Sequence, residues 1–402
     1  MSGYRTLLRE RVGEEGVPVW RIKCCSLSKE EDITCHVVAS CGDGTIRVYE
    51  LGRRSSDDMN PWSITCVQSI TGKINKQYPE LCSSSGMDLL RNYNGQDEWG
   101  GHIILGTVRF DGHIMFYTST EGSENDNSEL FVPLPESSWR VEMATGTIFK
   151  LVLLQHFVGV WIGTLEHTLE LYSTGISTPP HHQTNSTIPP AGTLLHTITA
   201  PPNSRGSSIV SSIATCPKTN NMAIGRSNGS FEIYSPNWNR IYTTTTSAKI
   251  RALSYTCDGE LLLVGNDDGD VIIYDAPSSQ VVEQIHQAHS SFIFSIAPCC
   301  IQSYSKFTTC SMDQTIKVWD TSKMPSQTGP VHSFTATAGG EDDFPWDMTT
   351  LSTTHHNTIR NNSQINHENI ILTSTNDATQ KNEICISAGN DGTIHVYSCN
   401  DK

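Results

Sequence analysis

A short pattern recurs seven times along the 402-residue chain, and it limits the fold more than any other feature. Each copy has a small residue, a two-residue turn, and then apolar residues at alternate positions that lead to an aromatic residue. This alternation is typical of a β-strand with one buried face. Asp-Gly and Asn-Gly favour hairpin turns of type I′, and we therefore predict seven tight hairpins. The predicted turns are Asp43-Gly44, Asp111-Gly112, His167-Thr168, Asn228-Gly229, Asp268-Gly269, Asp313-Gln314 and Asp391-Gly392.

A further apolar run precedes each hairpin, and in most units another follows it. These runs add an inner and an outer strand, so that each unit has four strands. Seven four-stranded units predict an all-β fold, a single seven-bladed β-propeller over residues 1–402. The predicted blades are 15–70, 84–143, 146–200, 207–246, 249–287, 290–336 and 344–400.

The seventh unit has no outer strand of its own, because the sequence stops a few residues after its third strand. The segment YRTLLRERV, residues 4–12, precedes the first inner strand and has no other predicted partner. We expect it to pair with the last blade and close the ring, since closure removes both exposed sheet edges.

Two polar insertions, residues 174–190 and 353–382, lengthen the third and seventh units. Both are rich in Ser, Thr, Asn or Pro and bury too little to be ordered on their own. Because such insertions mostly join first to second or third to fourth strands, we expect them on one face of the disc. The opposite face would then stay open.

Charge argues against direct binding of nucleic acid. The chain has 27 Lys and Arg against 42 Asp and Glu, a formal net charge of −15, with no basic tract. No P-loop, G-x-S-x-G or H-E-x-x-H motif occurs, so we predict no enzymatic activity, no catalytic residue, and no cofactor or metal site.

The sequence predicts that the protein stays inside the cell. The N-terminus has no apolar signal region, and the most apolar stretch falls short of a membrane span. Thirteen cysteines are scattered without a C-x-x-C pair. Inside a cell we expect them to be reduced, small apolar side chains.

The sixth unit contains His289, Thr309, Asp313 and Trp319 in the order of the fullest WD-repeat signature. These residue types can form a hydrogen-bond chain in which a carboxylate orients an imidazole. A catalytic triad uses similar groups. We favour the structural interpretation because the residues belong to the repeat itself.

Partner-binding candidates lie where the inner strands begin, close to the mouth of the disc. Aromatic and Arg side chains are enriched in the energetic centres of protein interfaces. The alternative for the aromatic residues is packing between blades. The candidates are Trp20, Phe149, Arg251, Phe294 and Trp346.

From about Ser208 onward the chain resembles the WD-repeat subunit of the superkiller complex, the superkiller protein eight family. The resemblance lies in KIRALSYTCDGELLLVGNDDGDVIIYD, QAHSSFIFSIAPCC, FTTCSMDQTIKVWD and ICISAGNDGTIHVYSC, and near the N-terminus in RTLLRERVGEEGVPVWRIKCC. It implies a non-catalytic cytoplasmic scaffold that joins a helicase and a tetratricopeptide-repeat protein in exosome-mediated 3′-to-5′ mRNA decay. The alternatives are a nuclear scaffold of the RNA-polymerase-II-associated factor complex, another chromatin complex, or a meiotic recombination complex.

Overall fold

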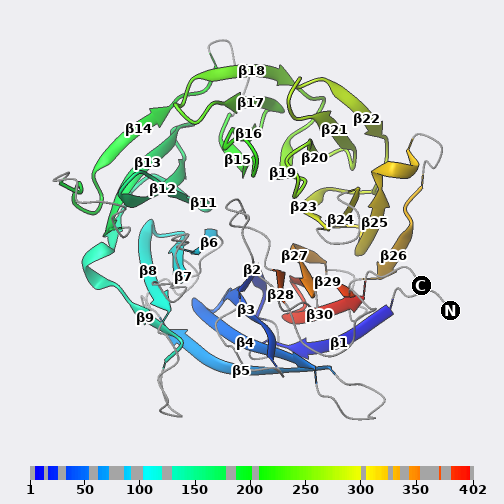
Figure 1. The fold of residues 1–402 in the computed structure, drawn as a ribbon, viewed down its shortest axis with the longest axis horizontal. Helices are drawn as coiled ribbons and strands as arrows, with labels where there is room; N and C mark the ends of the chain where they lie inside the picture. The colour runs from blue at the N-terminus through cyan, green and yellow to red at the C-terminus, as the bar shows by residue number, and fades with distance from the viewer. Residues whose placement is uncertain are drawn as a thin grey trace, which may run out of the picture.

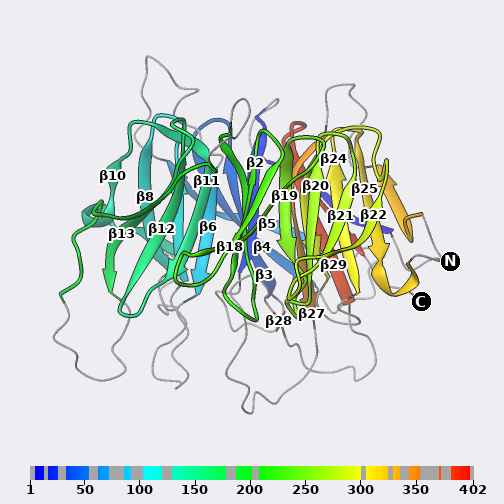
Figure 2. The ribbon, with the colours of Figure 1, turned by 90° about the horizontal axis from the view of Figure 1, so that it is seen from above.

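Seven antiparallel sheets stand around a common axis in the computed structural model (Figure 1). Figure 2 shows the ring from its side, with the strands running between two faces. The structure describes residues 5–12, 17–25, 33–53, 62–71, 86–91, 103–119, 129–177, 187–201, 208–299, 305–324, 329–335, 344–353, 371–372 and 382–398. The all-β, seven-bladed propeller is confirmed.

The blades follow the chain order, and within each blade the strands run from the axis outward. Blade 1 has β2 Val19–Cys25, β3 Ile33–Cys41, β4 Thr45–Arg53 and β5 Trp62–Thr71. Blade 2 has β6 Gly86–Arg91, β7 Ile103–Val108 and β8 His113–Ser119, with an outer strand in two pieces, β9 Phe131–Pro133 and β10 Trp139–Arg140. Blade 3 has β11 Ala144–Leu153, β12 Phe157–Thr164, β13 Leu169–Ser177 and β14 Leu194–Ile198.

The remaining blades keep this plan. Blade 4 has β15 Val210–Thr215, β16 Met222–Arg226, β17 Ser230–Tyr234 and β18 Arg240–Thr245. Blade 5 has β19 Ile250–Tyr255, β20 Leu261–Asn266, β21 Val271–Asp275 and β22 Val281–Ile285. Blade 6 has β23 Ile293–Pro298, β24 Lys306–Ser311, β25 Thr315–Asp320 and β26 His332–Thr335. Blade 7 has β27 Pro345–Thr353, β29 Asn382–Gly389 and β30 Thr393–Ser398, and short 3₁₀ turns lie at Pro135–Ser137 and Thr321–Lys323.

The ring closes through the N-terminal strand, as the sequence predicts. Strand β1 Arg5–Arg11 pairs antiparallel with β30, with Arg11 opposite Thr393. The N–H of Val12 donates to the carbonyl of Gly392 at 2.6 Å, and the side chain of Val12 is fully buried. The last blade therefore takes its outer strand from the other end of the chain.

The two predicted insertions are described only in part. A two-residue strand, β28 Ile371–Leu372, pairs parallel with β27 inside the second insertion. Residues 178–186, 354–370 and 373–381 lie outside the described residues. The expectation that the insertions share one face therefore stays a prediction.

The hairpin turns differ from the predicted type I′. Each of the seven has a three-residue loop in which only the third residue has a positive φ, for example Gly44 at 82° and Gln314 at 67°. The N–H of Gly44 donates to the carbonyl of Cys41 at 3.1 Å, which indicates a type I turn followed by a left-handed residue. In blade 3 this residue is His167, so the turn lies one position before the predicted dipeptide.

Apolar side chains fill the spaces between neighbouring blades. Val38 and Val48 of blade 1, for instance, belong to one buried cluster with Leu105 and Tyr117 of blade 2. Full burial of such a side chain is worth about 1.5–3 kcal/mol. The hydrophobic core is thus divided into seams between blades, and each seam needs both neighbours.

Most described cysteines are buried and free, as expected of small apolar side chains. Cys257 differs, because it is disulfide-bonded. Its partner lies outside the described residues. The expectation of uniformly reduced cysteines is therefore wrong at this position.

Acid should destabilise the protein through His36. This imidazole is fully buried in β3, with Nε2 3.5 Å from Oε1 of Glu50, and burial lowers its pKa to about 4. In the unfolded chain a histidine has a pKa of about 6.5, so the unfolded state binds the proton first as the pH falls. Between pH 7 and pH 4 the free energy of unfolding should therefore drop by about 3 kcal/mol because of this group.

Urea unfolding of wild type and His36→Gln at several pH values measures this contribution. The variant should lose less stability on acidification than wild type. His113→Gln is the matched control, because the side chain of His113 is 53% exposed. Equal pH dependence of His36→Gln and wild type would contradict the assignment.

Candidate functional site

The four residues of the sixth-unit signature form one continuous hydrogen-bond chain. The indole N–H of Trp319 donates to Oγ1 of Thr309 at 2.9 Å, and the Thr309 hydroxyl lies 2.6 Å from Nε2 of His289. Nδ1 of His289 lies 2.9 Å from Oδ2 of Asp313. Because the Asp313 carboxylate can only accept, Nδ1 of His289 donates to it, and in the neutral imidazole Nε2 then accepts from the Thr309 hydroxyl.

The chain in blade 6 has the chemistry of a buried support. Burial lowers the pKa of His289, although Asp313 opposes this effect. Burial would raise the pKa of Asp313, but hydrogen bonds from His289 and Thr315 hold it below its usual value. His289 and Thr309 are fully buried, so a substrate could not reach them from solvent.

Other blades use ion pairs near the same turn. The acidic turn residue pairs with an arginine in two of them and contacts a histidine in a third. The pairs are Asp43 with Arg47 at 2.7 Å, Asp111 with Arg109 at 2.9 Å, and Asp391 with His395 at 2.9 Å.

Blade 4 contains a fully buried ion pair that the sequence analysis did not single out. Nε of Arg226 donates to Oε1 of Glu232 at 2.5 Å, and both side chains are 0% exposed. Arg226 also donates to the carbonyls of His167 and Ser208 at 2.9 Å, while the hydroxyl of Tyr234 donates to Glu232. Arg226 therefore ties blade 4 to the turn of blade 3.

Four of the five predicted partner-binding residues occupy equivalent positions. Trp20, Arg251, Phe294 and Trp346 are each the residue skipped where the register shifts at the start of an inner strand. A bulge of this kind changes the direction of the side chain. These four side chains are partly exposed at the face that carries the turns between second and third strands.

Phe149 does not belong with them. The inner strand of blade 3 begins at Ala144, and its register shift falls between Ala144 and Phe149. Phe149 is 6% exposed and packs on Phe116 of blade 2, with ring centroids 6.1 Å apart. It packs between blades, which is the alternative stated for the aromatic candidates, and therefore lies apart from the other four.

The bulged residues meet further aromatic side chains from nearby loops. The centroids of Trp20 and Trp346 are 5.3 Å apart, and those of Phe294 and Trp346 are 4.7 Å apart. We call the set the aromatic rim. It comprises Trp20, Phe110, Phe292, Phe294, Phe344 and Trp346, all partly exposed, and spans blades 1, 2, 6 and 7.

Arg251 extends the rim to blade 5. Its guanidinium carbon lies 4.7 Å from the ring centroid of Phe292 and 5.4 Å from that of Phe294. The guanidinium also pairs with Asp267, Nη2 to Oδ2 at 3.1 Å. Arg251 is thus held in place by rings and a carboxylate.

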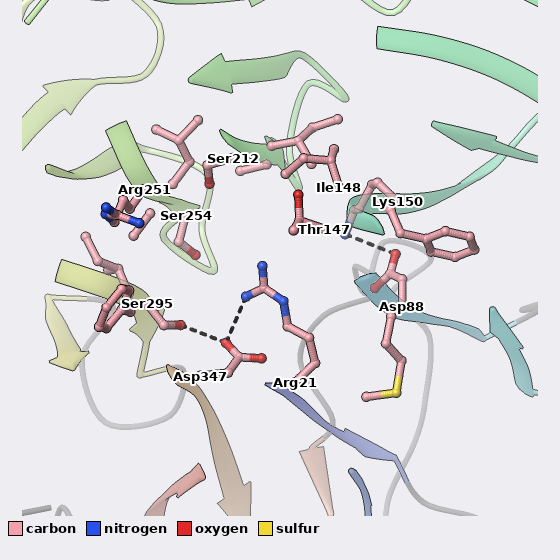
Figure 3. Close-up of a pocket in the computed structure, with 18 of the residues that line it drawn as sticks. Arg21, Asp88, Thr147, Ile148, Lys150, Ser212, Arg251, Ser254, Ser295 and Asp347 are labelled. Atoms are coloured by element: carbon pink, nitrogen blue, oxygen red, sulfur yellow. Dashed lines mark hydrogen bonds and ion pairs between the residues drawn. The ribbon is translucent and has the colours of Figure 1, made fainter. Parts of the chain in front are cut away.

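Below the rim the axis opens into a cavity of about 140 Å³ (Figure 3). The charged residues among its described lining are Arg21, Lys23, Asp88, Lys150, Arg251 and Asp347. Figure 3 shows the Arg21 side chain reaching toward the middle of this cavity. Of these residues, sequence reasoning singled out only Arg251, although charges inside otherwise apolar inner strands were a visible signal for the others.

The two carboxylates join neighbouring blades. Oδ2 of Asp88 in blade 2 accepts the N–H of Leu151 in blade 3 at 2.9 Å. Oδ2 of Asp347 in blade 7 accepts the N–H of Ile22 in blade 1 at 3.1 Å. Each of these hydrogen bonds joins the inner strands of two neighbouring blades.

A second, larger cavity of about 340 Å³ opens toward the opposite face, beside blades 3 and 4. Leu153, Trp161, Met222 and Trp238 contribute to its apolar wall. Trp238 has a φ of 61°, which is uncommon for a bulky residue. In the part of the chain that the structure describes, no cluster of His, Cys, Asp and Glu could hold a metal ion, and no helix is long and apolar enough to cross a membrane.

Family models match two segments. A model described as WD domain, G-beta repeat matches residues 17–50, and one described as anaphase-promoting complex subunit 4 WD40 domain matches residues 213–305. Among solved structures, the chain is similar to Saccharomyces cerevisiae Sqt1 with a TM-score of 0.59 and to the WD40 β-propeller domain of Doa1 with 0.55. The Sqt1 match covers 100% of both chains, and the Doa1 match covers 100% of this chain and 98% of the other; both are 13% identical. At this identity they show the fold alone.

Curated relatives match a shorter stretch. DDB1- and CUL4-associated factor 10 of Xenopus tropicalis is 30% identical over 94 residues, which cover 23% of this chain and 20% of that protein. The human protein of the same name is 29% identical over 94 residues, 23% of this chain and 16% of that protein. The chain thus spans about a fifth of these relatives.

Proposed function

We propose that this chain, a seven-bladed WD40-repeat β-propeller, is a non-catalytic scaffold whose partner protein docks on the aromatic rim. The observation that carries the proposal is the contiguous arc of partly exposed aromatic rings and Arg251 at one mouth of the disc. Aromatic and Arg side chains dominate binding energy at protein interfaces. Contiguous exposed apolar surface marks sites of interaction.

Within this role, the motifs from Ser208 onward support a superkiller-type subunit in cytoplasmic 3′-to-5′ mRNA decay. Its partners would be a helicase and a tetratricopeptide-repeat protein. A nuclear elongation, chromatin or recombination scaffold is the alternative setting. A third candidate is a substrate receptor that assembles with DDB1 and CUL4, and the similarity to DDB1- and CUL4-associated factor 10 favours it.

Affinity purification of the tagged protein from its own cells tests both levels of the proposal. The partners that copurify identify the complex: helicase and tetratricopeptide-repeat subunits, polymerase-associated factors, or DDB1 with a cullin. The rim variant Phe294→Ala with Phe344→Ala should capture at least about tenfold less of these partners, since hot-spot truncations cost 2 kcal/mol or more.

The matched control removes similar apolar area elsewhere. Ile241 and Val282 lie on outer strands and are 55% and 58% exposed. Ile241→Ala with Val282→Ala should capture partners as wild type does. Full capture by the rim variant would overturn docking on the rim. To test the role of Arg251 in the rim, Arg251→Gln is preferable to Arg251→Glu, because a glutamate at this position would lie close to the carboxylate of Asp267.

A further inference from the structure

The cavity below the aromatic rim has a charge opposite to that of the whole chain. Four cationic residues and two carboxylates are found among its described lining residues. The chain as a whole has a net charge of −15. Of the two carboxylates, Asp88 and Asp347 are 6% and 8% exposed, while the side chains of Arg21 and Lys23 are 31% and 35% exposed. Arg21 and Lys23 are therefore more exposed to the open space than the carboxylates are, whereas Lys150 is 13% exposed.

The ion pairs in the cavity are loose. Asp88 is shared by two ammonium groups, Lys23 at 3.9 Å and Lys150 at 3.6 Å, both beyond hydrogen-bond distance. Arg21 lies 3.5 Å from Asp347. At these distances each cation is joined to its carboxylate mainly by charge, and the side chains of Arg21 and Lys23 remain 31% and 35% exposed.

The ion pairs of these cations cross blade junctions, but other contacts join the inner strands as well. They run from backbone N–H groups to Asp88 and Asp347, and from the Ser295 hydroxyl to Asp347 at 3.0 Å. Between blades 4 and 5 a serine hydroxyl, that of Ser211, bonds the carbonyl of Ile250. Arg21, Lys23 and Lys150 come from blades 1 and 3 and converge only in the folded ring.

Like charges held close together in a recess repel one another, and the recess concentrates their field. Beside the rim, burial and nearby Arg251 lower the pKa of Lys249. A bound anion would relieve the repulsion among the cavity cations and accept hydrogen bonds from their N–H groups.

We propose that the axial cavity is a binding site for an anion of the phosphate class, either free or carried on a side chain of a docked partner. A volume of about 140 Å³ holds about ten ordered waters at 10–15 Å³ each, which leaves room for one phosphate group and its remaining hydration. The guanidinium of Arg21 matches two phosphate oxygens. Lys23, from the same strand as Arg21, and Lys150, from β11, supply point charges.

Isothermal titration of the full-length protein with sodium pyrophosphate at low ionic strength tests the site. We expect saturable binding of one anion that weakens as salt is added, because the cavity opens to solvent. Arg21→Gln with Lys23→Gln should weaken binding at least about tenfold. Lys218→Gln, which removes an exposed lysine paired with Glu260 outside the cavity, should leave it unchanged.

A gain of affinity separates a binding role from a structural one. Asp88→Asn retains an oxygen that can accept the N–H of Leu151 but removes a negative charge, so pyrophosphate should bind several-fold more tightly. Lys23→Gln alone replaces the double variant if that one does not fold. Absence of saturable binding to wild type, or equal affinity of wild type and the cavity variants, would overturn the proposal.

Two further experiments are needed. One separates failure of this proposal from failure of docking on the rim, and the other identifies the source of the anion. Phe344 does not line the cavity, so Phe344→Ala should bind pyrophosphate normally even where partner capture is lost. Release of captured partners by pyrophosphate would place the anion on the partner. Retention of partners alongside pyrophosphate binding would indicate a free anion.

Discussion

Removal of residues 1–14 should lower the free energy of unfolding by about 5 kcal/mol or more, because it takes the outer strand from blade 7. Val12 is fully buried in a cluster with Ile394 and Val396, and Leu7 and Leu8 pack partly against the same cluster. Each such side chain contributes about 1.5–3 kcal/mol when fully buried. The deletion also exposes the edge of β30 to other chains.

Thermal unfolding and size-exclusion chromatography measure the two consequences. The truncated protein should melt at a clearly lower temperature and form higher oligomers. Deletion of residues 1–4 is the control, since it leaves β1 Arg5–Arg11 in place. An unchanged melting temperature after deletion of residues 1–14 would mean that β1 contributes little to the closed ring.

Glu232→Ala should destabilise the protein by about 3–5 kcal/mol, the usual cost of leaving a buried charge without its partner. Arg226 would then keep a buried guanidinium whose carboxylate partner is gone, and Tyr234 would lose its acceptor. Replacement of both charges, Arg226→Met with Glu232→Leu, should recover most of the loss. The ion pair is therefore costly to break and inexpensive to replace.

Chemical denaturation of Arg226→Met, Glu232→Leu and the double variant gives the coupling energy between the side chains. The exposed pair of Lys218 and Glu260 serves for comparison, and Glu260→Ala should cost less than about 1 kcal/mol. If the free energy of unfolding of Glu232→Ala stays within about 1 kcal/mol of wild type, the buried ion pair contributes little to stability.

The blades could be predicted because each hairpin is a local structure. The period of two and the small residues act over about ten residues, and every blade repeats them; five of the seven hairpins also have an Asp-Gly or Asn-Gly turn. The turn type could not be predicted in the same way. Asp-Gly permits both type I′ and a type I turn with a left-handed third residue, and the choice depends on register with the neighbouring strand. His167 shows this, because a non-glycine residue takes the positive φ there.

The rim was partly predictable for a similar reason. Trp20, Arg251, Phe294 and Trp346 each begin an inner strand, and the sequence shows where those strands begin. Phe149 also precedes an apolar run, but its strand starts five residues earlier. Whether a side chain faces the mouth or the next blade depends on a one-residue register shift, which the apolar pattern of blade 3 does not reveal.

The sequence by itself determined the all-β class, the seven repeats, and the closing strand at the N-terminus. Those features depend on local periodicity and on the need to cover sheet edges. Only the tertiary structure decided that Arg21, Lys23, Lys150 and Arg251 surround one cavity, and that Arg226 pairs with Glu232 out of water. Residues from blades 1, 3 and 5 become neighbours only when the ring closes, because the circular arrangement brings together inner strands that are far apart along the chain.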